Sequence, residues 1–251
     1  MPETLLAAFQ IEGLIWLIAV VLVAGLVRGF SGFGSALIIM PVASSVLAPI
    51  EAIIFLTAVE LLGPLPNLPA AWRDGAPGEI GLMLFGALLA LPLGLWCLTL
   101  LHPVLFGWLV SVVVLILLAL VMAGWRYRGA LTRPLVMGTG GLGGFLTGFI
   151  GIPGPPVIML YMASTQAISV IRANFLLYLL GIDLLLFLLL IGAGVMAWPI
   201  FVLGLCVALP YVVVNMIGAR LFNPEAARLF RTVAYVVIAA SAIVGLPVWK
   251  G

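Results

Sequence analysis

Residues 25–41 read GLVRGFSGFGSALIIMP, and residues 140–161, GGLGGFLTGFIGIPGPPVIMLY, repeat their plan. At an offset of 119 residues, the pairs Gly29/Gly148, Phe30/Phe149, Gly32/Gly151 and Met40/Met159 align. We interpret the chain as one transmembrane domain made by duplication, with a first repeat at 1–126 and a second at 127–251.

Each copy joins two apolar runs through a glycine-rich segment; we name residues 29–34 the first hinge and 148–153 the second hinge. Glycine costs about 1 kcal/mol per residue in a helix relative to alanine, so we expect the helix to break at each hinge. A bilayer tolerates broken backbone only inside protein or beside a cavity, so paired hinges indicate a transport site. Alternatively, the glycines only let helices pack closely, as Gly25-x-x-x-Gly29 and Gly140-x-x-x-Gly144 would.

The composition excludes a soluble protein. Of the 251 residues 65% are hydrophobic and 7% are charged, and the mean hydropathy is +1.40, which predicts a polytopic membrane protein. The net charge of +2 is too small to indicate nucleic acid as a partner. Cys97 and Cys206 lie in apolar runs without a metal-ligand pattern, so neither a disulfide nor a metal site is predicted.

The predicted fold is an all-α polytopic membrane protein of eight to ten segments, five per repeat. Since five is odd, the second repeat would enter the membrane from the opposite side, giving an inverted-topology repeat. Two runs of some 21 Å are too short for a hydrocarbon core of about 30 Å, so they either cross at a tilt or re-enter; we favour crossing. Pro64 and Pro66 should interrupt the third run. The expected runs are 11–27, 35–48, 51–70, 80–101, 103–124, 134–150, 155–167, 170–191, 198–219 and 226–246.

The loop arginines predict the orientation, because basic residues concentrate on the cytoplasmic side. We expect the protein to lie in the bacterial inner membrane. With the N-terminus outside and ten crossings, Lys250 is the only basic residue predicted on the outer side. The arginines that then lie inside are Arg28, Arg73, Arg126, Arg128, Arg133, Arg172, Arg220, Arg228 and Arg231.

Two acidic residues lie near the middle of apolar runs, Glu60 and Asp183, and their spacing of 123 is close to the repeat offset. A carboxylate at membrane depth is costly and indicates function. Apolar surroundings disfavour the charged form of a carboxyl group, so either residue is a candidate proton carrier. The alternative is that each acid bonds a neighbouring helix and holds the bundle together.

The hinges carry groups that bind anions. A helix that restarts after a break exposes unpaired N–H groups, and a nearby guanidinium can hold an oxyanion through two parallel bonds. Arginines near the hinges could instead only anchor the chain at the cytoplasmic interface. The residues expected to bind substrate are Arg28, Gly29, Ser31, Gly32, Gly34, Ser35, Thr147, Gly148, Gly151, Pro153, Gly154 and Arg172.

Both motifs resemble those of the TauE/SafE family of sulfite exporters. The resemblance rests on RGFSGFGSALIIMP followed by Glu51-Ala52, and on TGFIGIPGPPVIMLYMAS followed by Arg172-Ala173. It implies secondary transport of sulfite, sulfonates or similar small anions, and no cofactor. A proton carried by Glu60 or Asp183 would let protons move with the anion or in exchange for it. A passive anion channel is the alternative, whereas an enzyme is not expected because no nucleophile set, metal cluster or nucleotide-binding loop is present.

Overall fold

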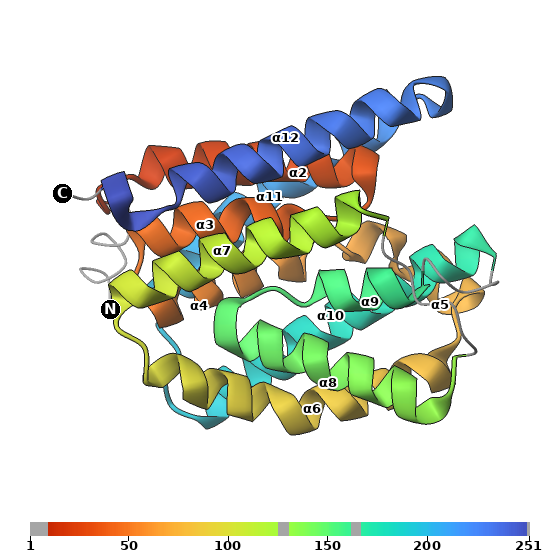
Figure 1. The fold of residues 1–251 in the computed structure, drawn as a ribbon, viewed down its shortest axis with the longest axis horizontal. Helices are drawn as coiled ribbons and strands as arrows, with labels where there is room; N and C mark the ends of the chain where they lie inside the picture. The colour runs from red at the N-terminus through yellow and green to blue at the C-terminus, as the bar shows by residue number, and fades with distance from the viewer. Residues whose placement is uncertain (1–9, 125–130, 162–166, 250–251) are drawn as a thin grey trace.

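The protein is helical throughout the ranges that the computed structural model describes, residues 10–124, 131–161 and 167–249, which contain no β-strand. A helix pairs the backbone N–H and C=O groups of its interior within one segment, as lipid requires. The α-helices, drawn in Figure 1, are α2 (Leu14–Ser31), α3 (Ser35–Val46), α4 (Pro49–Leu61), α5 (Leu68–Asp74), α6 (Pro77–Thr99), α7 (Pro103–Met122), α8 (Arg133–Ile150), α9 (Gly154–Tyr161), α10 (Ile168–Gly192), α11 (Trp198–Leu221) and α12 (Ala227–Val244). Short 3₁₀ turns lie at η1 (Leu65–Asn67), η2 (Pro224–Ala226) and η3 (Pro247–Trp249).

The long apolar helices make the chain a multi-pass membrane protein. In the described ranges, six helical segments are long and apolar enough to cross a membrane. These segments are Leu14–Ser31, Pro49–Asp74, Pro77–Thr99, Pro103–Met122, Ser169–Gly192 and Trp198–Leu221.

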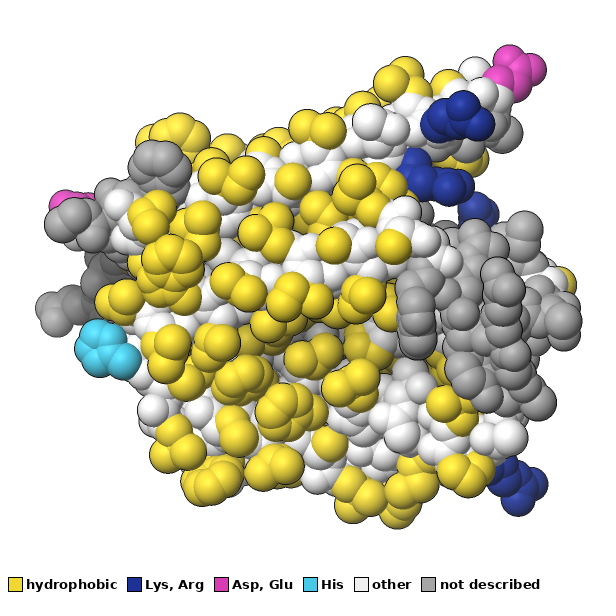
Figure 2. Space-filling view, in the orientation of Figure 1, with side chains coloured by type: hydrophobic (Ala, Val, Ile, Leu, Met, Phe, Trp, Pro, Cys, Tyr) yellow, Lys and Arg dark blue, Asp and Glu magenta, His cyan; other side chains and the backbone are white. Residues whose placement is uncertain are grey.

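The outer surface matches a lipid environment. Large apolar side chains cover the face shown in Figure 2. Among the large hydrophobic residues of the described ranges, Ile15 and Leu229 are 81% and 63% exposed. A soluble monomer rarely exposes so extensive an apolar surface. The Lys and Arg side chains visible on this face gather at one end. Arg28, which was predicted among the loop arginines, is instead buried within α2. Arg126, Arg128 and Lys250 lie outside the described residues.

Helix α3 is enclosed by protein. All its residues from 35 to 44 are buried, and it contacts α2, α4, α7 and α12. Figure 1 shows α3 between α7 and the pair α2 and α12. The break that precedes α3 therefore lies inside the bundle, where broken backbone is tolerated.

Glycines allow the closest helix pairs, α6 with α8 and α2 with α11, to touch through their backbones. A Cβ atom at Gly140 would overlap the carbonyl oxygen of Met83, and one at Gly29 would overlap that of Asn215. Gly29 and Gly140 therefore lie at close helix crossings, which is the alternative role that the sequence left open for them.

The helix ends near the hinges refine the predicted runs. Helix α2 continues past residue 27 through Arg28 and Gly29 to Ser31, so only residues 32–34 of the first hinge are non-helical. The run predicted at 51–70 is interrupted near the predicted prolines, because α4 ends at Leu61 and η1 follows. The short run predicted at 155–167 is α9 up to Tyr161, and residues 162–166 lie outside the described residues.

Candidate functional site

The first hinge reverses the chain with two glycines in left-handed conformation. Gly32 has φ 81° and Gly34 has φ 96°, values that side chains with a Cβ rarely adopt. The N–H of Gly32 donates to the carbonyl of Arg28 at 2.7 Å and ends α2. Helix α3 then starts at Ser35, so the sequence GFG positions a helix start inside the bundle.

The second hinge uses one such glycine and a set of prolines. Gly151 has φ 75°, and its N–H donates to the carbonyl of Thr147 at 2.9 Å, which ends α8. Ile152 and Pro153 lead to α9, which starts at Gly154. Pro155 and Pro156 fit the first turn of a helix, where their missing N–H groups break no helical bond.

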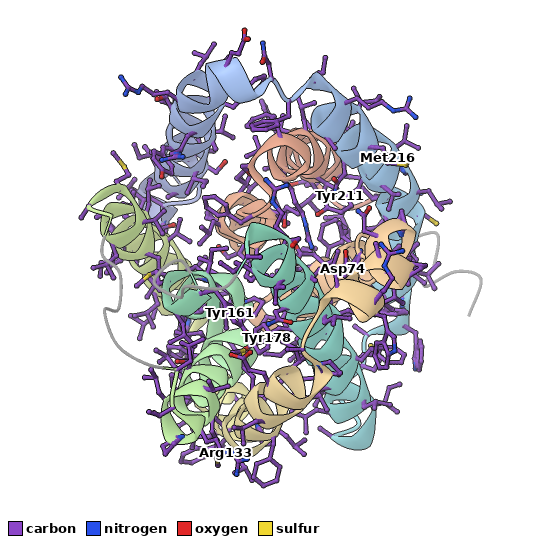
Figure 3. The ribbon with its side chains drawn as sticks, turned by 90° about the vertical axis from the view of Figure 1, so that its right-hand side faces the viewer. Asp74, Arg133, Tyr161, Tyr178, Tyr211 and Met216 are labelled. Atoms are coloured by element: carbon purple, nitrogen blue, oxygen red, sulfur yellow. The ribbon has the colours of Figure 1, made fainter. Side chains whose placement is uncertain are left out.

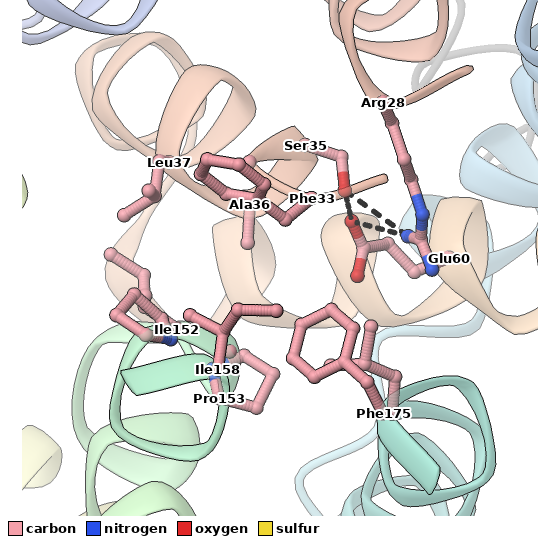
Figure 4. A pocket seen from close by; sticks show the side chains of 14 residues that line it. Arg28, Phe33, Ser35, Ala36, Leu37, Glu60, Ile152, Pro153, Ile158 and Phe175 are labelled. Carbon is pink, nitrogen blue, oxygen red and sulfur yellow. Dashed lines mark hydrogen bonds and ion pairs between the residues drawn. The ribbon is translucent and has the colours of Figure 1, made fainter. Parts of the chain in front are cut away.

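A small cavity lies where the two hinges meet. It is lined from the first hinge and α3 by residues 33–37, and from the second hinge and α9 by residues 152–155 and Ile158. Arg28, Glu60, Phe175 and Leu179 complete the lining, as Figure 4 shows for most of these side chains. Its volume is about 30 Å³, which holds one or two water molecules, so a larger occupant requires the hinges to separate.

Arg28 is the centre of the polar side of this cavity. Its Nη1 donates to Ser35 Oγ and to the Tyr211 hydroxyl, each at 3.1 Å, and lies 3.2 Å from Glu60 Oε1. The Ser35 hydroxyl donates to the same Oε1 atom. Arg28 and Glu60 are only 8% and 2% exposed, so this is a buried, hydrogen-bonded ion pair.

Part of the donor capacity on this side is unused. Within the described residues, no hydrogen bond of Arg28 involves Nε or Nη2. The first helical bond at the start of α3 runs from Ile38 to Gly34, so the N–H groups of residues 35–37 have no helical partner. These N–H groups and the guanidinium together can donate hydrogen bonds to the oxygens of an anion.

Asp183 lies close to this pair without lining the cavity. It interacts electrostatically with Glu60 and Arg28, and it is buried. Its Oδ2 atom and the buried hydroxyl of Tyr178, also on α10, have no hydrogen-bond partner among the described residues. In the end-on view of Figure 3, Tyr178 and Tyr211 are labelled inside the ring of helices.

The structure separates the predicted residues into two groups. Arg28, Gly34, Ser35, Glu60, Pro153 and Gly154 line the cavity together. Ser31 and Thr147 instead donate to carbonyls of their own helices, Val27 and Gly143, both at 2.6 Å, and Arg172 is exposed at the start of α10. The predicted residues that do not line the cavity are Gly29, Ser31, Gly32, Thr147, Gly148, Gly151, Arg172 and Asp183.

Sequence reasoning missed Tyr211 and the aromatic lining residues Phe33 and Phe175. Tyr211 is 183 residues from Arg28 and belongs to no motif. Phe33 lies within the first hinge, where the prediction rested on the glycines and the polar residues. The described residues hold no group of three or more His, Cys, Asp or Glu side chains able to bind a metal ion.

Comparison with known families agrees with the hinge motifs. A family model described as sulfite exporter TauE/SafE matches residues 17–244, which is most of the chain. The chain belongs to the TauE/SafE family. Its members are sulfite exporters by description, so this TauE/SafE protein is a membrane transporter of the anion-exporting kind. Searches of curated proteins and of solved structures found no match.

Proposed function

We propose that this TauE/SafE protein is a secondary transporter of small anions, such as sulfite, sulfonates or related organic anions, and that the cavity between the hinges binds the substrate. The observation that carries this proposal is the buried ion pair of Arg28 and Glu60 where two helix breaks meet. Charged groups at membrane depth are costly, and those inside a bundle typically belong to a substrate or ion pathway.

We also propose that Glu60 couples anion binding to a proton. When Glu60 is ionised, it neutralises Arg28 and accepts the Ser35 hydroxyl. Once Glu60 takes up a proton, the guanidinium loses the charge of its ion-pair partner, and an anion can take that place. Proton and anion then strengthen each other's binding by the same factor, as linkage requires. Asp183, which interacts with both members of the pair, is the second candidate proton carrier.

The residues outside the cavity have supporting roles in this proposal. Gly32 and Gly151 provide the left-handed turns, while Gly29 and Gly148 hold each hinge against a neighbouring helix, α11 and α6 respectively. The exposed Arg172 would attract an arriving anion at the cytoplasmic end.

The inverted-repeat architecture is part of the same proposal. Shifted by the repeat offset of 119 residues, the bounds of α2 become 133 and 150, which are those of α8. Equivalent helices of the two repeats also pack on equivalent partners in the other repeat. Helix α2 packs on α11 as α8 packs on α6, and α3 packs on α12 as α9 packs on α7. In Figure 1, α2 starts at the end that carries the N label and α8 starts at the opposite end.

Reconstituted vesicles test the transport proposal. We expect accumulation of sulfite or a short sulfonate against its gradient when a proton gradient is imposed, and loss of that accumulation in Arg28→Gln. Arg220→Gln, which changes an exposed arginine, is the matched control and should transport normally. Passive anion currents without any accumulation would refute the transporter proposal and support the anion channel.

Accessibility of introduced cysteines tests the repeat proposal. With ten crossings, residue 13, before α2, and residue 132, before α8, should be labelled from opposite sides of the membrane. Labelling of both positions from one side would refute the inverted repeat.

A further inference from the structure

The cavity between the hinges has one polar wall and one apolar wall. The polar wall consists of Arg28, Ser35 and Glu60 with the start of α3. The opposite wall is formed by the second hinge, α9 and α10, and its side chains are Ile152, Pro153, Pro155, Ile158, Phe175 and Leu179. Figure 4 shows Ile158 and Phe175 facing the polar group across the cavity.

The apolar wall offers almost no hydrogen-bond donors. Pro153, Pro155 and Pro156 lack an N–H group, so of residues 153–156 only Gly154 has one. An inorganic oxyanion such as sulfate presents oxygens in every direction and loses water from all of them on entry. Oxygens that face prolines and aromatic rings would stay unpaired, which makes binding of such an ion costly.

The charge of the lining limits the charge of the ligand. Arg28 is the cationic side chain of the lining, and Glu60 balances it when ionised. With Glu60 protonated, the lining carries one net positive charge, which one negative charge on the ligand neutralises. A dianion would leave a second negative charge in a buried site, beside Asp183.

We propose that this site selects organic monoanions that carry a compact apolar group over inorganic dianions, and that Phe175 and Ile158 set this preference. A sulfonate or carboxylate head would lie against Arg28 and the N–H groups of α3, with the apolar group against the opposite wall. The inference rests on the proposed function, since it takes this cavity to be the substrate site.

A ligand series tests the inference on the unmodified protein. Binding to the purified full chain in detergent is measured by calorimetry for sulfate, methanesulfonate, ethanesulfonate and propanesulfonate. We expect sulfate to bind weakest, and affinity to rise about fourfold for each methylene that becomes buried. Sulfate binding as tightly as propanesulfonate, or a flat sulfonate series, would overturn the proposal.

Variants of the apolar wall test whether its side chains cause the preference for organic monoanions. Phe175→Ser should reduce the gain per methylene and improve sulfate relative to propanesulfonate, while Phe175→Leu should retain the series. Phe85→Ser changes an exposed phenylalanine of α6 and should leave the series unchanged. If Phe175→Ser does not fold, Ile158→Thr tests the same wall with a smaller β-branched side chain that carries a hydroxyl. An unchanged series in the folded wall variants would contradict the assignment.

Transport separates this inference from the proposed function. Selective binding of organic monoanions without accumulation in vesicles would refute the transporter and support the selectivity. Accumulation of sulfate and propanesulfonate at equal rates and equal affinities would support the transporter and refute the selectivity.

Discussion

The ion pair between Arg28 and Glu60 can be tested by a double-mutant cycle with Arg28→Gln and Glu60→Gln. Two unit charges 3.2 Å apart attract by about 5 kcal/mol at an effective dielectric constant of 20. Both groups have lost their water, and that desolvation offsets most of the attraction. Removing one partner leaves the other charge buried and unbalanced, so each single variant should lose about 3–5 kcal/mol of unfolding free energy. The double variant should lose far less than the sum of the two.

The assay is reversible unfolding of the purified protein, followed in lipid or detergent for the wild type, both single variants and the double variant. We expect a coupling energy on the order of 3 kcal/mol. Arg220→Gln, at an exposed position on α11, should change the unfolding free energy by less than about 0.5 kcal/mol. If the two single losses add to within about 0.5 kcal/mol, Arg28 and Glu60 do not form a pair and the coupling scheme loses its basis.

The same Glu60→Gln variant tests the coupling itself. Glutamine cannot ionise, so in this variant Arg28 has no charged partner at position 60 at any pH. If Glu60 carries the proton, anion affinity in the wild type should fall with rising pH, and this dependence should be weaker in the variant. Any dependence that remains in the variant points to Asp183, the second candidate proton carrier. A wild-type affinity that does not change with pH would refute proton coupling at Glu60.

Four further outcomes follow from other positions. Gly140→Ala should destabilise the chain by about 1–3 kcal/mol in unfolding assays, because its Cβ would overlap Met83, whereas Gly138→Ala faces open space and should be neutral or stabilising. Gly32→Ala should cost about 1–2 kcal/mol of unfolding free energy through backbone strain alone, since no atom lies within 4 Å of its Cβ; a neutral result would contradict the left-handed turn. Asp183→Asn should abolish the stimulation of anion uptake by a proton gradient if Asp183 carries the proton. Arg172→Gln should raise the KM of uptake but retain accumulation, unlike Arg28→Gln, because Arg172 is exposed.

The fold was predictable from the sequence where local chemistry decides the structure. Apolar runs bounded by proline and glycine indicated the helices, and GFG and GIPG indicated the two breaks. The glycines were ambiguous, because a broken helix and a close helix crossing both need a residue without a side chain. The structure shows that the backbone of α11 approaches Gly29 and that of α6 approaches Gly148, so both glycines lie at close helix crossings.

The site was only partly predictable, because its contacts join distant segments. Arg28 and Glu60 were each selected, one for its place beside a hinge and the other for its charge in an apolar run. Their pairing was not predicted, since it depends on how α4 packs against the start of α3. Tyr211 could not be found at all, because nothing local distinguishes it from the other tyrosines of the chain.

The two hinges differ chemically at the positions where the repeat offset of 119 residues aligns them. Arg28 aligns with Thr147 and Ser35 with Gly154, while Ala36 and Leu37, which supply free N–H groups, align with Pro155 and Pro156, which have none. Two identical hinges would place two guanidiniums and two sets of donors around one anion, and such a site would release its ligand slowly. Divergence of the second hinge leaves one charged wall, and under the proposed coupling Glu60 would change the charge of that wall by gaining or losing a proton. Restoring donors to the second hinge, by Pro155→Ala together with Pro156→Ala, should therefore tighten anion binding and slow turnover. Faster turnover with unchanged affinity would show that the prolines of α9 do not act through the donors that they remove.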